Sequence, residues 1–118
     1  MRHDASFLND ILNSARKIEA AVSSTSEQAF FGNEVLQAAV LHHLTVIGEA
    51  ANRLSPALRE RHPEVPWTEM AAVRHRIVHA YFDLDWQILW SAATEDVPRL
   101  RDLVEGILKS EEPAQGSI

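Results

Sequence analysis

The chain contains no cysteine, and this absence excludes three kinds of site: a thiol nucleophile, a structural disulfide and a zinc centre with cysteine ligands. It also has no run of eighteen apolar residues and no apolar segment of signal-peptide length after Met1. Its 118 residues include only 4 glycines, and 46% are hydrophobic, which excludes collagen-like repetition and general disorder. We therefore expect one cytoplasmic domain with a core of its own and no membrane segment.

Positive charge is scarce, and the formal net charge is −6. This balance argues against sequence-blind binding to nucleic acid or to an anionic membrane. The charge is unevenly distributed, because residues 53–81 hold five arginines, three glutamates and three histidines. A small basic patch on an acidic body suits a defined phosphate site better than a long nucleic-acid groove, and a chance fluctuation of charge in a short chain is the alternative.

Apolar residues recur at steps of three and four in several segments, which is the period of an amphipathic helix. They predict a helix over residues 7–22 and a long central helix over residues 34–54. A short helix through residue 30 is expected between them, with Ser24 and Glu27 in capping-box order. Pro56 ends the central helix or begins a brief turn.

Two further helices are expected in the second half of the chain. One runs from residues 66 and 67 to about residue 81. The other follows a cap at residues 83–85, has a buried stripe from residue 86 to 107, and is kinked at Pro98, whose ring meets the carbonyl of Thr94. No strand pattern, internal repeat or phosphate-binding glycine loop is present in the sequence. We expect an all-α antiparallel bundle of four main helices plus short helices over residues 1–109, and a disordered tail over 110–118.

The third main helix holds the residues of most chemical interest. On a helical wheel, Arg74 falls within an apolar arc that also contains Trp67, Met70, Ala71, Ile77, Val78 and Tyr81. A buried arginine needs a partner because its guanidinium keeps its charge. Glu49, in a run of small residues that allows close helix approach, is the interior acid best placed for a structural ion pair. The alternative is a cleft or subunit interface where Arg74 meets phosphate.

His79 lies five positions after Arg74, which is about 140° around an ideal helix, so the two residues do not share a face within one copy. A bend at the helix end, or a second subunit across a two-fold axis, would bring them to one phosphate. An imidazole can take a proton from a ribose 2′-hydroxyl or give one to the leaving oxygen, while an arginine offsets charge on the phosphorane. The pair therefore suits RNA cleavage, and an ordinary surface histidine is the alternative.

The histidine spacing also raises the question of a metal. His75 and His79 stand at i and i+4, which can chelate a transition metal, but no glutamate of the metalloprotease type lies between them and Arg76 opposes a cation. We expect no metal and no cofactor. His43 is interpreted as a packed, hydrogen-bonded residue, and the tryptophans as core residues rather than base platforms: Trp67, Trp86 and Trp90.

The segment from Arg74 to Tyr81, read as Arg-x4-His-x-Tyr, resembles the Rx4HxY signature of HEPN-domain ribonucleases. Its surroundings resemble the HepT-like toxin branch of that superfamily. The similar segments are Ile-Gly-Glu-Ala-Ala at 47–51, Pro-Glu-Val-Pro-Trp at 63–67, residues 85–90 and Pro-x-Leu at 98–100. The likeness extends in order over about residues 7–108.

This resemblance implies a dimeric, metal-independent endoribonuclease that is the toxin of a toxin–antitoxin pair, with tRNA as the expected RNA substrate. Its partner would be an MNT-type nucleotidyltransferase antitoxin. Arg74 and His79 would be the catalytic pair near the dimer interface, supported by His75, Arg76 and Glu49. Tyr81 would be an orienting residue of the site. It also matches the tyrosine that the antitoxin of this family modifies with AMP, which would place bulk and negative charge where the substrate phosphate must lie.

The chain departs from the family pattern directly after the signature arginine, where many members have Asn or Asp and this one has His75. Histidine can still donate or accept a hydrogen bond at this position. The alternative to an active ribonuclease is a catalytically silent helical dimer that binds a nucleotidyltransferase, with Arg74 tied to Glu49 as scaffold. A small-ligand or nucleotide-binding bundle is a more distant alternative.

Overall fold

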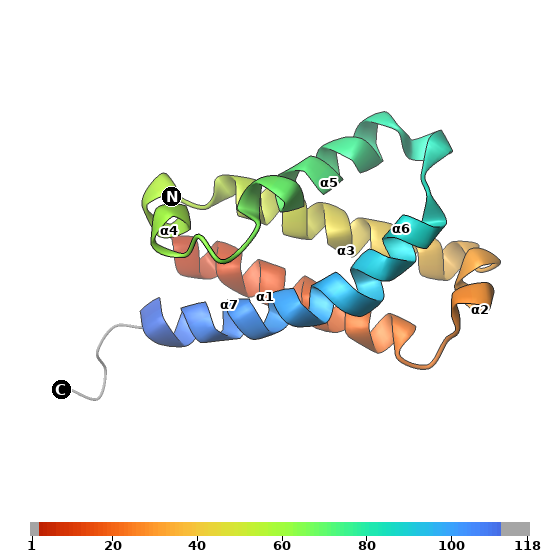
Figure 1. The fold of residues 1–118 in the computed structure, drawn as a ribbon, viewed down its shortest axis with the longest axis horizontal. Coiled ribbons are helices and arrows are strands. Elements are labelled where there is room, and N and C mark those ends of the chain that lie inside the picture. Colours follow the sequence, from red (N-terminus) through yellow and green to blue (C-terminus); the bar gives the residue numbers. More distant parts are fainter. Residues whose placement is uncertain (1–2, 112–118) are drawn as a thin grey trace.

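A computed structural model describes residues 3–111, which form helices joined by short connections, without a strand in this part of the chain. The elements are α1 Asp4–Val22, α2 Glu27–Phe31, α3 Glu34–Arg53, α4 Pro56–Arg61, α5 Trp67–His79, η1 Tyr81–Asp83, α6 Trp86–Ser91, η2 Ala92–Asp96 and α7 Val97–Glu111. The long helices alternate in direction along the molecule (Figure 1). The expected all-α antiparallel bundle is therefore confirmed.

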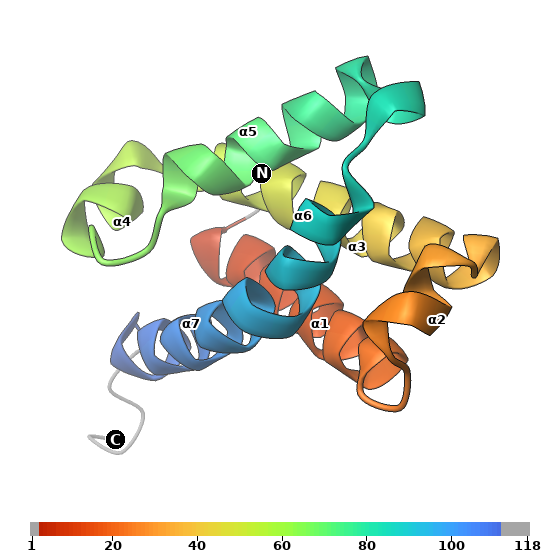
Figure 2. The same cartoon turned by 45° about the vertical axis from the view of Figure 1, so that its right-hand side comes forward.

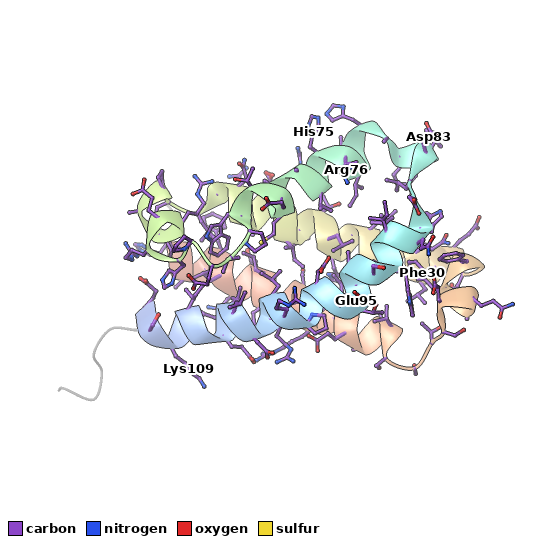
Figure 3. All side chains as sticks on the ribbon, in the orientation of Figure 1. Phe30, His75, Arg76, Asp83, Glu95 and Lys109 are labelled. Atoms are coloured by element: carbon purple, nitrogen blue, oxygen red, sulfur yellow. The ribbon has the colours of Figure 1, made fainter. Side chains whose placement is uncertain are left out.

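The core lies between α1, α3 and α7, and α5 packs on the opposite side of α3 from α1, as both views show (Figures 1 and 2). The apolar stripe of α1 is buried as its spacing predicts: Leu8, Ile11, Ala15, Ile18 and Val22. Since α3 contacts both α1 and α5, it is the central helix that the sequence indicates. Phe30 closes one end of the bundle, with its ring 5.9 Å from Trp86 and 5.2 Å from Trp90 (Figure 3).

The structure corrects the expected start of the short second helix. Ser26, and not Ser24, caps α2, because its Oγ accepts a hydrogen bond from the Ala29 amide at 3.1 Å. Glu27 is then the first residue of the helix, too early to occupy the third position that a capping box requires. At the next boundary, Pro56 begins α4 behind the Ser55 cap, as a proline in the first turn does.

The predicted fourth helix is divided into two helices. Asp85 caps α6 as expected, accepting from the amides of Gln87 and Ile88. The wider turn η2 then leads into α7, so the irregularity precedes Pro98 and is a π-helical turn rather than a simple kink. A π turn relieves the conflict because it moves backbone carbonyls out of the α-helical register that the proline ring would meet.

At its C-terminal end, α7 reaches Glu111, two residues beyond the expected boundary, and the remainder of the expected tail lies outside the described residues.

An ion-pair cluster fastens the end of α7 to α4. The Glu111 carboxylate accepts from Arg61 at 2.7 and 3.1 Å and lies 2.7 Å from Nε2 of His62. These hydrogen bonds, that of Arg61 first, lower the pKa of Glu111 from 4.5 to about 2. Arg61 and His62 of the expected basic patch are thus engaged with α7, away from the C-terminal end of α5 (Figure 1).

A lowered carboxyl pKa in the folded state predicts a definite pH dependence. The stabilisation by Glu111 is complete above pH 4.5 and is lost as the pH falls toward 2, because the folded protein must then take up the proton that the unfolded chain binds more readily. We expect Glu111→Gln to lower the urea midpoint at pH 7, and the difference from the unsubstituted protein to shrink between pH 4.5 and 3. A difference that is the same at both ends of this range would contradict the assignment.

Candidate active site

The site is built on a close contact between α3 and α5 at Gly48. A Cβ at this position would lie 2.5 Å from the Cβ of Arg74 and 2.8 Å from the carbonyl oxygen of Met70. Only a residue without a side chain permits this approach, which confirms the interpretation of the small residues in the central helix. Gly48 therefore places the stem of Arg74 directly against the backbone of α3.

The next residue of α3, Glu49, faces the Arg74 guanidinium as the sequence predicts. The distance from Nε of Arg74 to Oε2 of Glu49 is 3.8 Å, and each side chain is 41% exposed. This separation is too long for a hydrogen bond, and the buried Nε has no hydrogen-bond partner. The pair is thus a loose electrostatic contact rather than a tight structural tie.

His79 is the last residue of α5 and its side chain is exposed. Its ring lies on that of His75, with the ring centroids 4.2 Å apart and the planes at 41°. His75 projects from α5 away from the bundle, and Arg76 follows it on the same helix (Figure 3). The imidazole of His79 is therefore open to a ligand that approaches from solvent.

One copy of the chain does not bring Arg74 and His79 into contact. Arg74 lies against α3, His79 lies on the exposed side of α5, and no hydrogen bond or ion pair joins them among the residues that the structure describes. This agrees with their angular separation on an ideal helix.

Tyr81 and Val78 correct the predicted apolar arc of the third main helix. Both were expected on the core side, and both are exposed, with Tyr81 at 53%. The helix ends at His79, so Tyr81 belongs to η1 and no longer follows the helical wheel, and Val78 is the last residue but one of α5. The ring of Tyr81 meets that of Phe82 edge-on at 5.5 Å. The Tyr81 side chain is consequently open to solvent.

The remaining predictions concern the packing of His43 and the absence of a metal site. His43 is packed as predicted, with Nδ1 3.2 Å from the Ser14 hydroxyl, and burial, with smaller effects of His42 and Lys17, lowers its pKa. Within residues 3–111 no group of three or more His, Asp or Glu side chains is arranged to hold a metal ion. No helix of this part of the chain is long and apolar enough to cross a bilayer.

A hollow that the sequence does not predict lies between α1 and α3 beside Glu49. Its volume is about 340 Å³, and its lining residues are Phe7, Asp10, His42, Thr45, Val46, Glu49, Ala50 and Arg53. Arg53 contacts the same carboxylate as Arg74, with its Nε 3.4 Å from Oε1 of Glu49. The i, i+4 spacing of Glu49 and Arg53 indicates their contact, but nothing in the sequence indicates that α1 adds a wall.

Comparisons with known proteins identify relatives of this chain. The profile of the family described as "Ribonuclease HepT-like" matches residues 11–107. A Methanocaldococcus jannaschii protein named as an RNase is 37% identical over 99 residues, which are 84% of this chain and 91% of the relative. A Thermococcus cleftensis protein named as a ribonuclease HepT is 34% identical over 108 residues, 92% of this chain and 98% of the relative. No solved structure matches the chain at a significant level.

Proposed function

We propose that this chain, which belongs to the HepT-like ribonuclease family, is a metal-independent endoribonuclease that uses His79 and Arg74. The observation that carries the proposal is the Arg74 guanidinium, held against α3 with a buried Nε that has no acceptor. The side chain is 41% exposed as a whole, so a phosphate oxygen would meet the outer nitrogens of the guanidinium, whose charge would offset the charge that develops on phosphorus. Glu49 orients the guanidinium without saturating it.

The proposed reaction is an attack of the ribose 2′-hydroxyl on the adjacent phosphorus. His79 takes the hydroxyl proton while the 2′-oxygen forms a bond to phosphorus and the bond to the 5′-oxygen breaks. The products are a 2′,3′-cyclic phosphate and a 5′-hydroxyl end, whose oxygen takes a proton from solvent or from a second imidazole. Because no step requires a Lewis acid, the reaction needs no metal ion.

A homodimer would complete this site. Within one copy Arg74 and His79 point in different directions, and a two-fold axis near the end of α5 would bring His79 of the partner subunit toward Arg74. His75 and Arg76, both exposed on α5, would then face the same phosphate chain and support its binding.

The physiological role that we propose is that of a toxin neutralised by an MNT-type nucleotidyltransferase. The exposed hydroxyl group of Tyr81 is open to AMPylation, which would add a phosphate two residues from His79 and repel the substrate. The net charge of −6 favours a structured RNA such as tRNA, presented in one defined orientation, over loose single strands.

Cleavage of total bacterial tRNA in EDTA tests this proposal. We expect the purified dimer to cut tRNA equally with EDTA and with Mg²⁺, and to leave cyclic phosphate ends. Preincubation with the antitoxin and ATP should stop cleavage by the unsubstituted chain and leave Tyr81→Phe active. Cleavage that appears only with added metal would overturn the metal-free mechanism.

One observation favours a second candidate, a silent module that binds the nucleotidyltransferase. The His75 ring covers one side of the His79 ring, at the position where many family members have Asn or Asp. A folded, dimeric chain that binds the antitoxin but cuts no tRNA would support this candidate. Recovery of cleavage on His75→Asn would then identify the histidine stack as the cause.

A further inference from the structure

Glu49 lies between two arginines, and both contacts are loose. Nε of Arg53 is 3.4 Å from Oε1, and Nε of Arg74 is 3.8 Å from Oε2. Arg53 belongs to α3 with Glu49, whereas Arg74 reaches it from α5. In the described part of the chain, the other arginine–carboxylate pairs that, like Arg74–Glu49, join different helices are shorter, at 2.7 to 2.8 Å: Arg16–Glu105, Arg61–Glu111 and Arg101–Glu19. Asp10 lies on the other wall of the hollow, so the group has no excess positive charge, and an anion would be favoured by the guanidinium donors that the long contacts leave without close acceptors.

The hollow beside this group has the size and lining of a small ligand site. Its volume of about 340 Å³ lies within the range of pockets that hold small molecules. Phe7 and Ala50 supply an apolar floor, and Asp10, His42 and Arg53 supply polar groups at its edge. A flat ring with a polar rim, such as a nucleobase on its ribose, matches this combination.

We infer that this hollow binds the nucleotide next to the scissile phosphate, and that Arg53 binds the phosphate of that nucleotide. The inference rests on the proposed function, since Arg74 is taken to hold the scissile phosphate. Because Arg53 and Arg74 share Glu49, an RNA chain with one phosphate at Arg74 brings its neighbouring phosphate to Arg53. The nucleoside between the two phosphates then lies over the hollow.

Two variants separate the charge of Arg53 from the volume of the hollow. Arg53→Gln removes the guanidinium charge, and Val46→Phe fills the hollow from a partly exposed position without changing charge. Arg16→Gln is the matched control, because it removes the same charge from a side chain of similar exposure, 55% against 62%, that faces α7 instead. All three are made in the His79→Ala chain, which is expected to bind RNA without cutting it.

The readout is the dissociation constant of fluorescently labelled total tRNA, measured by anisotropy at several salt concentrations. We expect Arg53→Gln to weaken binding about tenfold and to reduce the salt slope by about one ion. Val46→Phe should weaken binding by a similar factor with the slope unchanged, and Arg16→Gln should change neither by more than about twofold. Light scattering should show the same mass for all variants.

Several results would overturn the inference. If Arg53→Gln and Arg16→Gln weakened tRNA binding equally, Arg53 would contribute only as one of many surface charges. If Val46→Phe left the dissociation constant unchanged, the hollow would not be a binding site for the RNA. A change of mass on Arg53→Gln would make this surface a subunit interface. Cleavage by the unsubstituted chain decides the proposed function separately, and failure of that chain to bind tRNA at all would contradict both.

Discussion

Replacing His79 by alanine is expected to reduce the rate of tRNA cleavage by about 10²- to 10⁴-fold, the range that a general acid or base contributes. His79 is exposed at the end of α5, and within the described residues the ring of His75 is its one aromatic neighbour. Removing the imidazole therefore leaves the core intact. We expect kcat to fall and KM to stay within a factor of about three, since the imidazole acts on a proton in the transition state rather than on substrate affinity. Single-turnover cleavage in EDTA measures the effect.

The matched control is His3→Ala, which removes another exposed histidine, one that precedes α1 and is not part of α5. This variant should cleave at the unsubstituted rate. Circular dichroism and light scattering should show the same helicity and mass for both variants. Retention of more than about a tenth of the activity by His79→Ala would exclude His79 as the proton-transfer group.

Replacing Gly48 by alanine is expected to lower the free energy of unfolding by about 2 kcal/mol, because the added methyl group overpacks the contact between α3 and α5. The obstacles at 2.5 and 2.8 Å are the Cβ of Arg74 and a backbone oxygen of α5, which move only if the whole helix moves. For a chain of this length the melting temperature should fall by about 8 °C. Because Arg74 is carried by α5, cleavage should fall as well.

Gly106→Ala is the matched control for this substitution. Gly106 is a glycine within α7, and a Cβ there would meet nothing within 4 Å. In an exposed helix interior the same change should stabilise the protein by about 0.5 to 1 kcal/mol. The two glycine variants should therefore shift the urea midpoint in opposite directions. A destabilised Gly106→Ala, or a stabilised Gly48→Ala, would contradict this account of the helix contact.

The elements that follow from local patterns were largely predictable. Periodicity located α1 and α3 to within a few residues, and Asp85 was correctly expected as the cap of α6. Two local predictions were wrong because more than one local solution was possible. Ser26 caps α2 in place of Ser24, and a π turn before Pro98 replaces the expected kink. Such choices depend on neighbouring helices, whose packing no short window of sequence contains.

In the candidate site, too, the local features could be predicted from the sequence and the contacts between helices could not. Arg74, His79 and Tyr81 could be read from the chain because the signature lies in eight consecutive residues, and their angular relation on a helix is a matter of local geometry. The position of Glu49 against Arg74 was predicted from the small residues around it, but its looseness and its sharing with Arg53 were not. A difference of a few tenths of an ångström between a guanidinium nitrogen and a carboxylate oxygen depends on how closely two helices pack.

What the sequence determined by itself is the set of helices, their apolar stripes and the family to which the chain belongs. Only the tertiary structure decided which face of α5 is covered, that Gly48 is the point of contact, and that a hollow lies between α1 and α3 beside Glu49. The physical reason is the distance along the chain over which each kind of interaction acts. Periodicity and capping act within one or two helical turns, whereas Glu49 and Arg74, or Asp10 and Arg53, become neighbours only when the whole core assembles.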